Sequence, residues 1–508
     1  MVFRTTSSAL TLALLLAGCD LGPDYEKPQV ELPVAFRATA ATEAAAWPSD
    51  DWWRGFGSAE LNELIDQARA QNMDIAAAIA RVRQADAQVR ISGAALLPTL
   101  GANGNASWTH TSISSSSSRL SGSSNSGTSA SSRKGAIETH SYSIGLNAAY
   151  EVDFWGKNRA AQQAARASAV FSRFDQQVVA LTVVTSVANT WFSALALADR
   201  LDVARHNLAD AEQSLAVIRG RLDAGTATAL DVAQQEALVA GERAVIPGLR
   251  SQMDQQLIGL GILVGRPPEA INLRPGSLTD LSLPAVAPGL PSSLLQRRPD
   301  VASAEAQLVA ANFDIKAARA AFFPSIQLTG SAGFQNGALT TLFGPGGFLA
   351  SLALGLLQPI FDGGLLRGQL ELSKGRYEEL LADYRKAVLQ AFTDVEDALT
   401  AWRFTTEQEA LQRRAVAAAQ RSANIAREQM RAGTVDVTTV LQAETTLFND
   451  QDNLAQVRLA RFQALLNLYK ALGGGWITPS GPVEEQFPGL RPGILPGGFA
   501  LPVGGNVR

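Results

Sequence analysis

The sequence predicts a mainly helical protein with a small β part, built from two similar halves. Three observations lead to this fold class. Long stretches without proline favour helices of unusual length, and short segments that alternate apolar and polar residues favour strands. The same order of helix, strand pair and long helical hairpin occurs twice. The chain has 508 residues, of which 46% are hydrophobic and 18% charged. This composition fits neither a disordered chain nor an ordinary helical membrane protein.

The composition also excludes several classes of function. The net charge of −4 gives no support for nucleic-acid binding, which normally needs a basic surface. The single cysteine rules out an intramolecular disulfide. The three histidines, His110, His140 and His206, are scattered and predict no metal site. Because the chain also lacks GxSxG, P-loop and HExxH motifs, we expect neither an enzyme nor a bound cofactor.

Residues 1–18 have the features of a signal peptide. Arg4 is the only charge before the apolar run Leu10–Leu16, which is too short to span a bilayer. The segment Leu16-Ala17-Gly18-Cys19 matches the bacterial lipobox, which implies cleavage before Cys19 and acylation of that residue. Several acyl chains anchor a protein stably. An ordinary signal peptide with a chance cysteine is the alternative, and Asp20 is a residue that holds some enteric lipoproteins at the inner membrane.

The first repeat is predicted to cover residues 58–264, after a proline-rich, extended segment at 19–57. Two helices open it, the second capped by Asn72 and ended by Pro98. Strands are predicted at 99–108 and 142–152, joined by a Ser/Gly-rich loop. The second strand alternates in the manner of a membrane barrel strand. Its apolar positions are Tyr142, Ile144, Leu146, Ala148 and Tyr150, and its polar or small positions are Ser143, Gly145, Asn147 and Ala149.

A long helical hairpin completes the first repeat. Residues 158–219 contain no proline and predict one helix roughly 90 Å long. A turn follows, and the returning helix runs from about 230 to 264. Within it, Pro247-Gly248 is expected to produce a kink or a break.

The second repeat is predicted at 300–475, after a Pro/Gly-rich connector at 265–299, and it precedes an irregular tail at 476–508. Its strands are expected at 325–334 and 349–360. A long helix to Arg431 follows, with apolar residues at alternating steps of three and four, which is typical of coiled-coil packing. These residues are Leu381, Tyr384, Val388, Ala391, Val395, Ala398 and Trp402.

The repeat is visible in individual residues. Ala224-Gly225-Thr226 matches Ala432-Gly433-Thr434. In the same register, Val232, Gln234 and Glu236 match Val440, Gln442 and Glu444. A period of roughly 200 residues indicates a duplicated unit rather than a short-repeat solenoid.

Several motifs together resemble the outer membrane factor (outer membrane efflux protein) family. The resemblance covers nearly the whole mature chain and is to the NodT-like or OprM-like lipoprotein branch that serves efflux pumps of the resistance-nodulation-division (RND) type. The motifs that carry it, beside the lipobox with Gly22-Pro23-Asp24-Tyr25, are Trp52-Trp53-Arg54-Gly55-Phe56, Phe154-Trp155-Gly156-Lys157-Asn158-Arg159, Arg297-Arg298-Pro299-Asp300-Val301, Gln358-Pro359-Ile360-Phe361-Asp362-Gly363-Gly364 and Leu468–Trp476.

The resemblance implies a TolC-like fold and a homotrimer in the outer membrane. Each chain then gives four strands to a 12-stranded barrel, and its helices form a hollow periplasmic cylinder. The segments 111–132 and 337–347 become extracellular loops, and the turns at 220–229 and 432–438 become the periplasmic tip. The expected function is passive conduction of drugs and other toxic small molecules, handed over by a periplasmic adaptor and an inner-membrane pump.

The tip holds the candidate functional residues. Acidic rings at this place narrow the entrance in relatives, and such rings select against anions. Where some relatives carry two gate aspartates, this sequence has Thr439 and Gln442, so the acidic candidates are Asp231 and Asp436. Each of these carboxylates is equally suited to cap a helix.

Arg221 and Arg431 are candidates for ion pairs that hold the tip closed, or for simple cations at helix ends. The two turns are the expected docking surface for the adaptor; their residues are Ala224, Gly225, Thr226, Ala432, Gly433 and Thr434.

Two other functions remain open at this level. One is a lipid-anchored coiled-coil scaffold without a pore, which the alternation of residues 142–152 argues against. The other is the outer-membrane duct of a type I protein secretion system, which uses the same scaffold.

Overall fold

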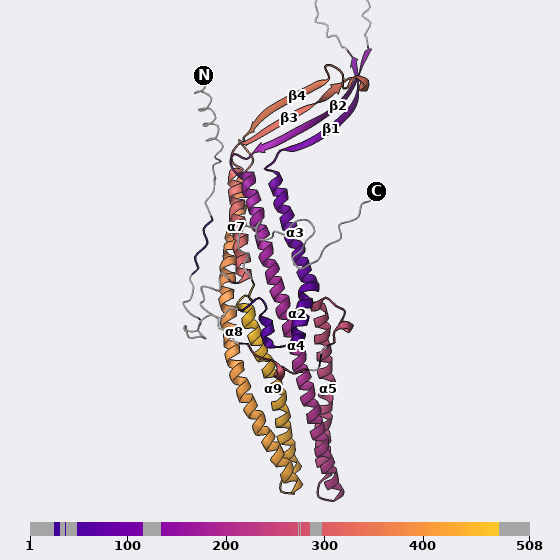
Figure 1. The fold of residues 1–508 in the computed structure, drawn as a ribbon, viewed down its shortest axis with the longest axis vertical. Helices are drawn as coiled ribbons and strands as arrows, with labels where there is room; N and C mark the ends of the chain where they lie inside the picture. The colour runs from indigo at the N-terminus through magenta and orange to yellow at the C-terminus, as the bar shows by residue number, and fades with distance from the viewer. Residues whose placement is uncertain are drawn as a thin grey trace, which may run out of the picture. The chain divides into compact units, whose positions relative to one another are not determined.

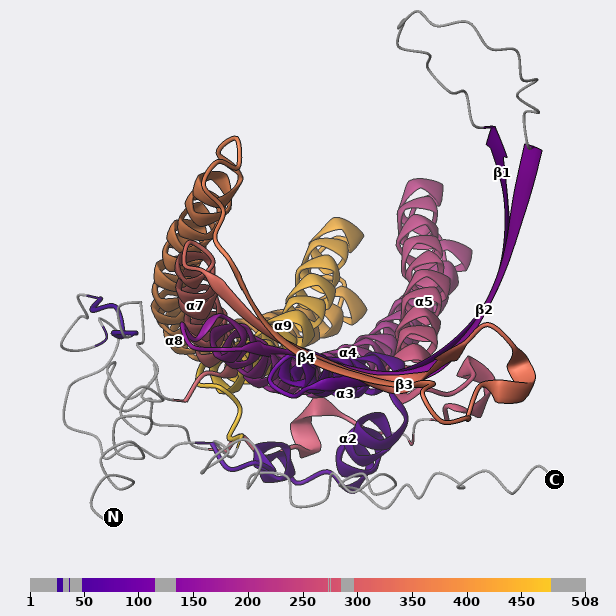
Figure 2. The same cartoon turned by 90° about the horizontal axis from the view of Figure 1, so that it is seen from above.

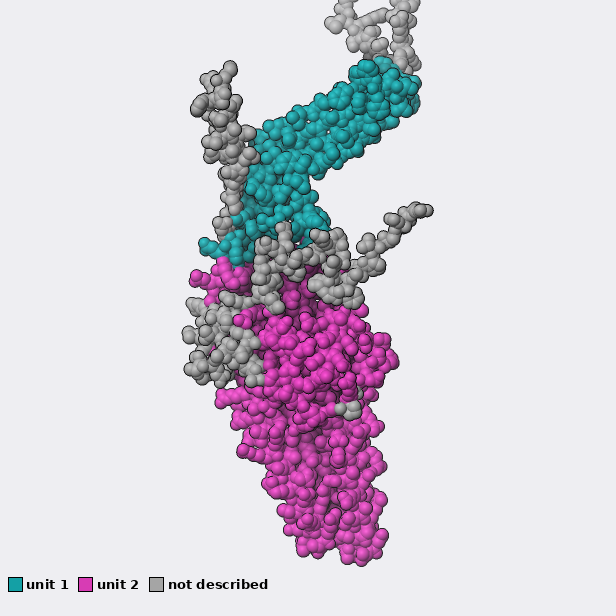
Figure 3. Space-filling model, viewed as in Figure 1, with its two compact units in different colours: residues 1–26, 86–166, 309–378 teal, residues 27–85, 167–308, 379–508 magenta. Residues whose placement is uncertain are grey.

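The computed structural model describes residues 25–30, 36, 48–114, 134–272, 274, 276–284 and 297–476. The predicted signal peptide, Cys19, Asp20 and the tail from residue 477 lie outside these residues. The chain divides into two compact units, each assembled from several segments (Figure 3). Unit 1 comprises residues 1–26, 86–166 and 309–378, and unit 2 comprises residues 27–85, 167–308 and 379–508.

Unit 1 contains a four-stranded antiparallel sheet with the strand order β1-β2-β3-β4, which is curved (Figure 2). The strands are β1 (Thr99–Ser114), β2 (Lys134–Val152), β3 (Ser325–Asn336) and β4 (Phe348–Leu357). The 3-10 helix η4 (Leu339–Thr341) lies between β3 and β4 in the sequence. The predicted β part is confirmed, although β4 ends at Leu357 rather than Ile360. At the other end of the sheet, β1 ends at Ser114 rather than Trp108, and β2 begins at Lys134 rather than Tyr142. Backbone pairing continues there without the apolar alternation on which the expected bounds relied.

One pair of glycines lets β2 and β3 approach closely. Gly145 and Gly333 are opposite each other in the register of these strands. A Cβ atom at Gly333 would lie 2.5 Å from the carbonyl oxygen of Ile144 and 2.6 Å from the Cα atom of Gly145. Glycine is therefore required at this position for the strands to keep their separation.

The remaining elements are helices, and the long ones run side by side in Figure 1. In chain order they are η1 (Trp52–Phe56), α2 (Ala59–Gln71), α3 (Met73–Ala94), α4 (Lys157–Asp223), α5 (Ala229–Val264), η2 (Pro268–Ala270), η3 (Leu278–Asp280), α7 (Pro299–Ala320), α8 (Leu365–Arg431) and α9 (Val437–Ala471). The duplication is plain in their lengths: α3 and α7 have 22 residues each, α4 and α8 have 67 each, and α5 and α9 have 36 and 35.

Local sequence explains where these helices begin. The hydroxyl of Ser58 accepts a hydrogen bond from the N–H of Leu61 at the start of α2. The predicted cap of α3 is also present, because Oδ1 of Asn72 accepts from the N–H groups of Asp74 and Ile75 at 2.8 and 3.1 Å. The helix α5 is continuous from Ala229 to Val264, with Pro247 inside it.

The main core of unit 2 contains a group of packed aromatic rings among aliphatic side chains. Trp52 stacks on Tyr469 with 4.7 Å between ring centroids, and the fully buried Phe56 packs edge-on against Phe192 at 5.0 Å. The helix α4 that supplies Phe192 contains a stretch apolar and long enough to cross a membrane, but half of that stretch is buried inside the protein. Its apolar character therefore serves helix packing.

The heptad positions predicted on α8 are confirmed as its packing face. Five of the seven predicted positions, Tyr384, Val388, Ala391, Val395 and Ala398, are buried, and the outermost two, Leu381 and Trp402, are half-buried. Because these positions recur every three or four residues, they form one continuous stripe along the helix.

Candidate functional site: the two sheet faces and the helix turns

The register of the sheet sorts its side chains by residue number. Leu100 is opposite Ala148, Ala148 is opposite Gly330, and Gly330 is opposite Leu352. Even-numbered residues of all four strands therefore share one face. Because successive side chains point to opposite sides of a strand, the odd-numbered residues form the other face.

The even-numbered face is apolar along the central part of the sheet. Several of its side chains are largely exposed in the single chain, among them Leu352 at 78% and Leu100 and Leu354 at 73% each. The apolar residues of this face are Leu100, Ala102, Ala106, Trp108, Tyr142, Ile144, Leu146, Ala148, Tyr150, Val152, Ile326, Leu328, Ala332, Phe334, Phe348, Ala350, Leu352, Leu354 and Leu356. A patch of this size does not face water in a monomeric protein, and it matches the lipid-facing band of a membrane barrel.

The odd-numbered face is dominated by hydroxyl and amide groups, and several are hydrogen-bonded across strands. Asn147 donates to Oδ1 of Asn103 at 2.8 Å, and the hydroxyl groups of Ser331 and Ser351 are 2.8 Å apart. Opposite polarity on the two faces is the arrangement expected when one face meets lipid and the other meets water.

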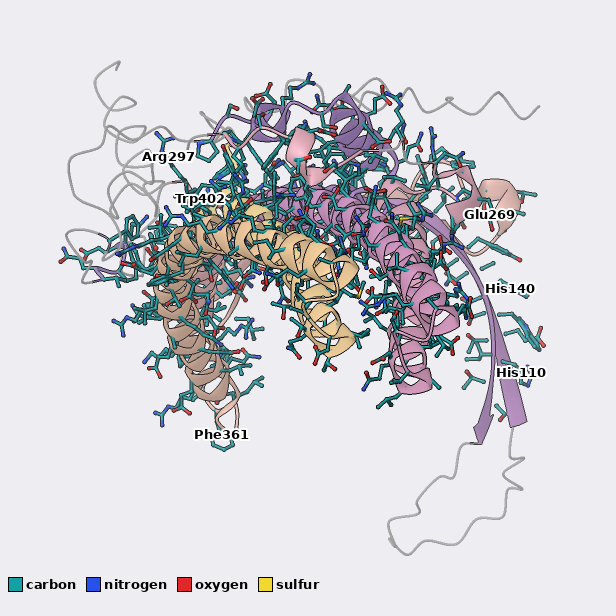
Figure 4. All side chains as sticks on the ribbon, turned by 90° about the horizontal axis from the view of Figure 1, so that it is seen from below. His110, His140, Glu269, Arg297, Phe361 and Trp402 are labelled. Atoms are coloured by element: carbon teal, nitrogen blue, oxygen red, sulfur yellow. The ribbon has the colours of Figure 1, made fainter. Side chains whose placement is uncertain are left out.

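Aromatic and ionisable side chains mark the two ends of the sheet. At one end, His110 on β1 lies 3.3 Å from Glu138 on β2, and His140 is the partner of Trp108 in the register (Figure 4). At the other end, the ring of Trp155 stacks on Phe323 at 4.8 Å. Aromatic residues gather at membrane–water interfaces, which suits both ends. Among the described residues, no three His, Cys, Asp or Glu side chains are placed to hold a metal ion.

The turn between α4 and α5 is built by its Ala-Gly-Thr motif. Gly225 has φ of +72°, a left-handed conformation that favours glycine. Thr226 closes the helix end, because its N–H and its hydroxyl both donate to the carbonyl of Arg221, at 2.8 and 3.1 Å. Thr228 and Asp231 then form a reciprocal capping box that starts α5.

The turn between α8 and α9 repeats this geometry, and both turns lie at the same end of the unit 2 helices (Figure 1). Gly433 has φ of +75°, and the N–H and hydroxyl of Thr434 donate to the carbonyl of Gln429 at 2.9 and 3.1 Å. Asp436 caps α9, accepting from the N–H of Thr439 at 2.9 Å and from its hydroxyl at 2.7 Å. These hydrogen bonds hold the pKa of Asp436 below its ordinary value.

Both acidic candidates thus have capping roles in this structure. The two arginines differ from each other. Arg221 donates to the carbonyl of Met430 at 2.5 Å and so joins the first hairpin to the second. Arg431 is exposed at the last position of α8. The guanidinium of Arg221 is bonded to backbone carbonyls, of Met430 and of Thr226, where the sequence had suggested a carboxylate partner.

A buried charge network links the two hairpins a few turns from the tip. Glu444 on α9 is completely buried and accepts from Arg427 on α8 at 2.7 Å and from Ser214 on α4 at 2.6 Å. Arg427 also reaches Asp210 on α4 at 2.9 Å, and Gln235 on α5 approaches Glu444 at 3.4 Å. Four helices therefore meet at one carboxylate.

The charges of this network depend on one another. Burial opposes the charge of Arg427, but the hydrogen bonds and charges of Glu444 and Asp210 outweigh it and raise the pKa of Arg427. Apolar clusters flank the network on the same helices: one includes Ile218, Met430 and Val440, and the other includes Leu215 and Leu447.

Sequence analysis identified Glu444 only as a match to Glu236 and missed its role in this network. A usable signal was present, because Glu444 occupies the apolar stripe of α9, four residues after Val440 and three before Leu447. A charge at a core-facing helical position needs a buried partner.

Comparison with known proteins agrees with this geometry. The family model described as outer membrane efflux protein matches residues 64–266 and 290–474. A pyoverdine export outer membrane protein of Pseudomonas aeruginosa is 41% identical over 470 residues, covering 92% of this chain and 96% of the relative. A cation efflux system protein, CusC of Escherichia coli, is 31% identical over 92% of this chain and 97% of its own length. The solved MtrE outer membrane channel of Neisseria gonorrhoeae superposes with a TM-score of 0.79 at 28% identity, covering 90% of this chain and 98% of that one.

An amphipathic four-stranded sheet joined to long helical hairpins defines an outer-membrane export channel that extends into the periplasm. The chain belongs to the outer membrane efflux protein family, with a TolC-like fold, and is the outer-membrane channel of a tripartite efflux system. It is a transport protein and not an enzyme.

Proposed function

We propose that the channel is a homotrimer in which three chains close one transmembrane barrel. The supporting observation is the sheet itself: among the described strands, β1 and β4 are open edges, and one face of the sheet is apolar along its central part. Open strand edges are not tolerated in lipid, because their N–H and C=O groups find no partner there. Three copies of the four strands give a closed barrel of 12 strands.

The two helix turns serve as the docking surface for a periplasmic adaptor, which connects the channel to an RND-type pump in the inner membrane. Both turns are at one end of the helices, and Ala224 and Ala432 are exposed there. Cys19 carries the lipid anchor in this proposal, which rests on the lipobox alone. The carboxylates of Asp231 and Asp436, with Arg221 and Arg431 beside them, line the closed entrance.

The cargo is a small molecule delivered by the pump. Relatives are named for pyoverdine export and for cation efflux, and both cargoes are small. Secretion of a protein through the same scaffold is the competing outcome of the test below.

A deletion strain tests the function. Loss of the gene is expected to raise sensitivity to antibiotics, solvents or metal ions, or to reduce export of a siderophore, and the wild-type gene restores the original state. Loss of one secreted protein with unchanged sensitivity and unchanged siderophore export would overturn the proposal of small-molecule efflux.

Assembly is tested separately. Native mass spectrometry of the detergent-purified protein should give three times the mass of the lipidated chain. A photo-crosslinking amino acid at Ala224 or Ala432 should capture the adaptor, whereas one at Leu411, an exposed position of α8 away from the turn, should not. Capture at Leu411 alone would refute docking at the turns.

A further inference from the structure

The odd-numbered face of the sheet is almost free of charge. Over the part of the sheet whose side chains the structure describes, Glu151 is its only ionisable residue. Glu151 lies one residue from the end of β2 and is paired with Lys157 at 2.6 Å. The polar side chains of the rest of this face are Thr99, Asn103, Asn105, Ser107, Thr109, Thr111, Thr139, Ser141, Ser143, Asn147, Ser325, Gln327, Thr329, Ser331, Gln335 and Ser351.

Hydrogen bonds orient many of these groups across the strands. Besides the Asn103–Asn147 and Ser331–Ser351 pairs, Gln335 donates to the hydroxyl of Ser141 at 3.3 Å. Each amide or hydroxyl in such a pair keeps further donor or acceptor capacity for a passing solute or for water. Apart from Glu151 with its Lys157 partner, the face therefore offers hydrogen bonds of both kinds without a fixed charge.

Charged rings are the usual means by which a pore selects ions, since each carboxylate or ammonium attracts one sign of charge and repels the other. An uncharged wall, in which these amides and hydroxyls stand beside the apolar residues Ile137, Leu349, Ala353 and Leu357, has no such preference. Any charge preference of the whole channel must then arise elsewhere, for instance at the carboxylates of Asp231 and Asp436 on the helix turns.

We propose that the barrel segment of this channel does not discriminate cargo by charge and suits hydrogen-bonding small molecules, whether cationic, anionic or neutral. This inference rests on the proposed function, because it takes the odd-numbered face as the wall of the water-filled lumen.

The test uses paired cysteine variants of the full-length protein in lipid nanodiscs. Ser143→Cys places a thiol on the odd-numbered face, and Ile144→Cys, one residue further, places one on the apolar face. Each is treated with methanethiosulfonate reagents carrying either a trimethylammonium or a sulfonate group. Rates are divided by those of a free small thiol, and the unsubstituted protein, whose only cysteine is Cys19, gives the background.

The inference predicts that Ser143→Cys reacts with both reagents, with a normalised cation-to-anion ratio within about twofold of one, and that Ile144→Cys does not react. Asn105 is directly opposite Ser143. A carboxylate there, about 6 Å away in water, is expected to shift the ratio about tenfold toward the cation. Asn105→Asp in the Ser143→Cys background therefore shows that the assay detects charge.

Two failures are distinguishable. If Ser143→Cys reacts but its ratio departs from one severalfold before any charge is introduced, the inference is overturned and the channel remains. If Ile144→Cys reacts while Ser143→Cys does not, the faces are reversed and the proposed barrel is overturned with it. Heat-resistant migration of each variant on a gel confirms that its barrel has folded.

Discussion

Removal of the Glu444 carboxylate should loosen the contact between the two helical hairpins. In Glu444→Leu, Arg427 loses its buried partner while its side chain stays only 17% exposed. Breaking one half of a buried ion pair costs about 3–5 kcal/mol. Asp210 still contacts Arg427 and is 42% exposed, so it offsets part of that loss. The lower end, about 3 kcal/mol, is therefore expected.

Hydrogen exchange measures this loss where it occurs. A cost of about 3 kcal/mol corresponds to roughly a hundredfold loss of protection if local opening governs exchange. The amides of the first turns of α9, around Val440, should show it, whereas those of the sheet should not. A channel with a loosened tip should also admit a large antibiotic that the outer membrane normally excludes.

A matched control separates this network from ion pairs in general. Glu236 pairs with Arg219 at 2.6 Å near the same end of the helices, but both side chains are about half exposed, and the pair lies within the first hairpin. Glu236→Leu should cost at most about 1 kcal/mol. The double variant Arg427→Met with Glu444→Leu removes both charges and should recover much of the lost protection. Equal effects of Glu444→Leu and Glu236→Leu would refute the reasoning.

Three further predictions concern the turns and the sheet. The pKa of Asp436 is lowered in the folded state, so its capping contribution to stability is present above the unfolded pKa and is lost as pH falls through the lower, folded pKa. Hydrogen exchange of the amides at the start of α9, corrected for its intrinsic pH dependence, should therefore rise in acid, and it should rise less in Asp436→Asn. Gly433→Ala should destabilise the second turn by about 1 kcal/mol in thermal melts, because its φ is +75°. Gly220→Ala, in the last turn of α4 with open space around it, should instead stabilise by about 0.5 kcal/mol. Leu352→Lys on the apolar face should lower the free energy of unfolding of the barrel by about 2–4 kcal/mol, measured by refolding into lipid, and Ser351→Lys on the other face should have little effect.

Much of the fold was predictable because its signals are local. The Ala-Gly-Thr turns, the Asn72 cap and the stripe from Tyr384 to Ala398 depend on neighbouring residues or on one helical period. The outer ends of β1 and β2 were missed because their pairing rests on backbone hydrogen bonds that carry no side-chain pattern.

The polar residues near the tip were less predictable. A cap and a gate both favour an aspartate, so Asp231 and Asp436 looked the same under either hypothesis. The structure adds their partners, Thr228 and Thr439. The network at Glu444 depends on four helices far apart in the sequence, which no local pattern specifies.

The two halves show how a duplicated unit divides its roles. Glu236 and Glu444 hold the same place in the repeat, yet Glu236 is half exposed and Glu444 is fully buried. Both returning helices lie wholly within the described residues, and α9 buries 13 residues where α5 buries six. Since α9 is packed more deeply, a charge on it must be satisfied by its neighbours, whereas the same charge on α5 is solvated. The second hairpin therefore carries the polar contact that holds the two hairpins together, and substitutions there should affect the tip more than the equivalent ones in the first.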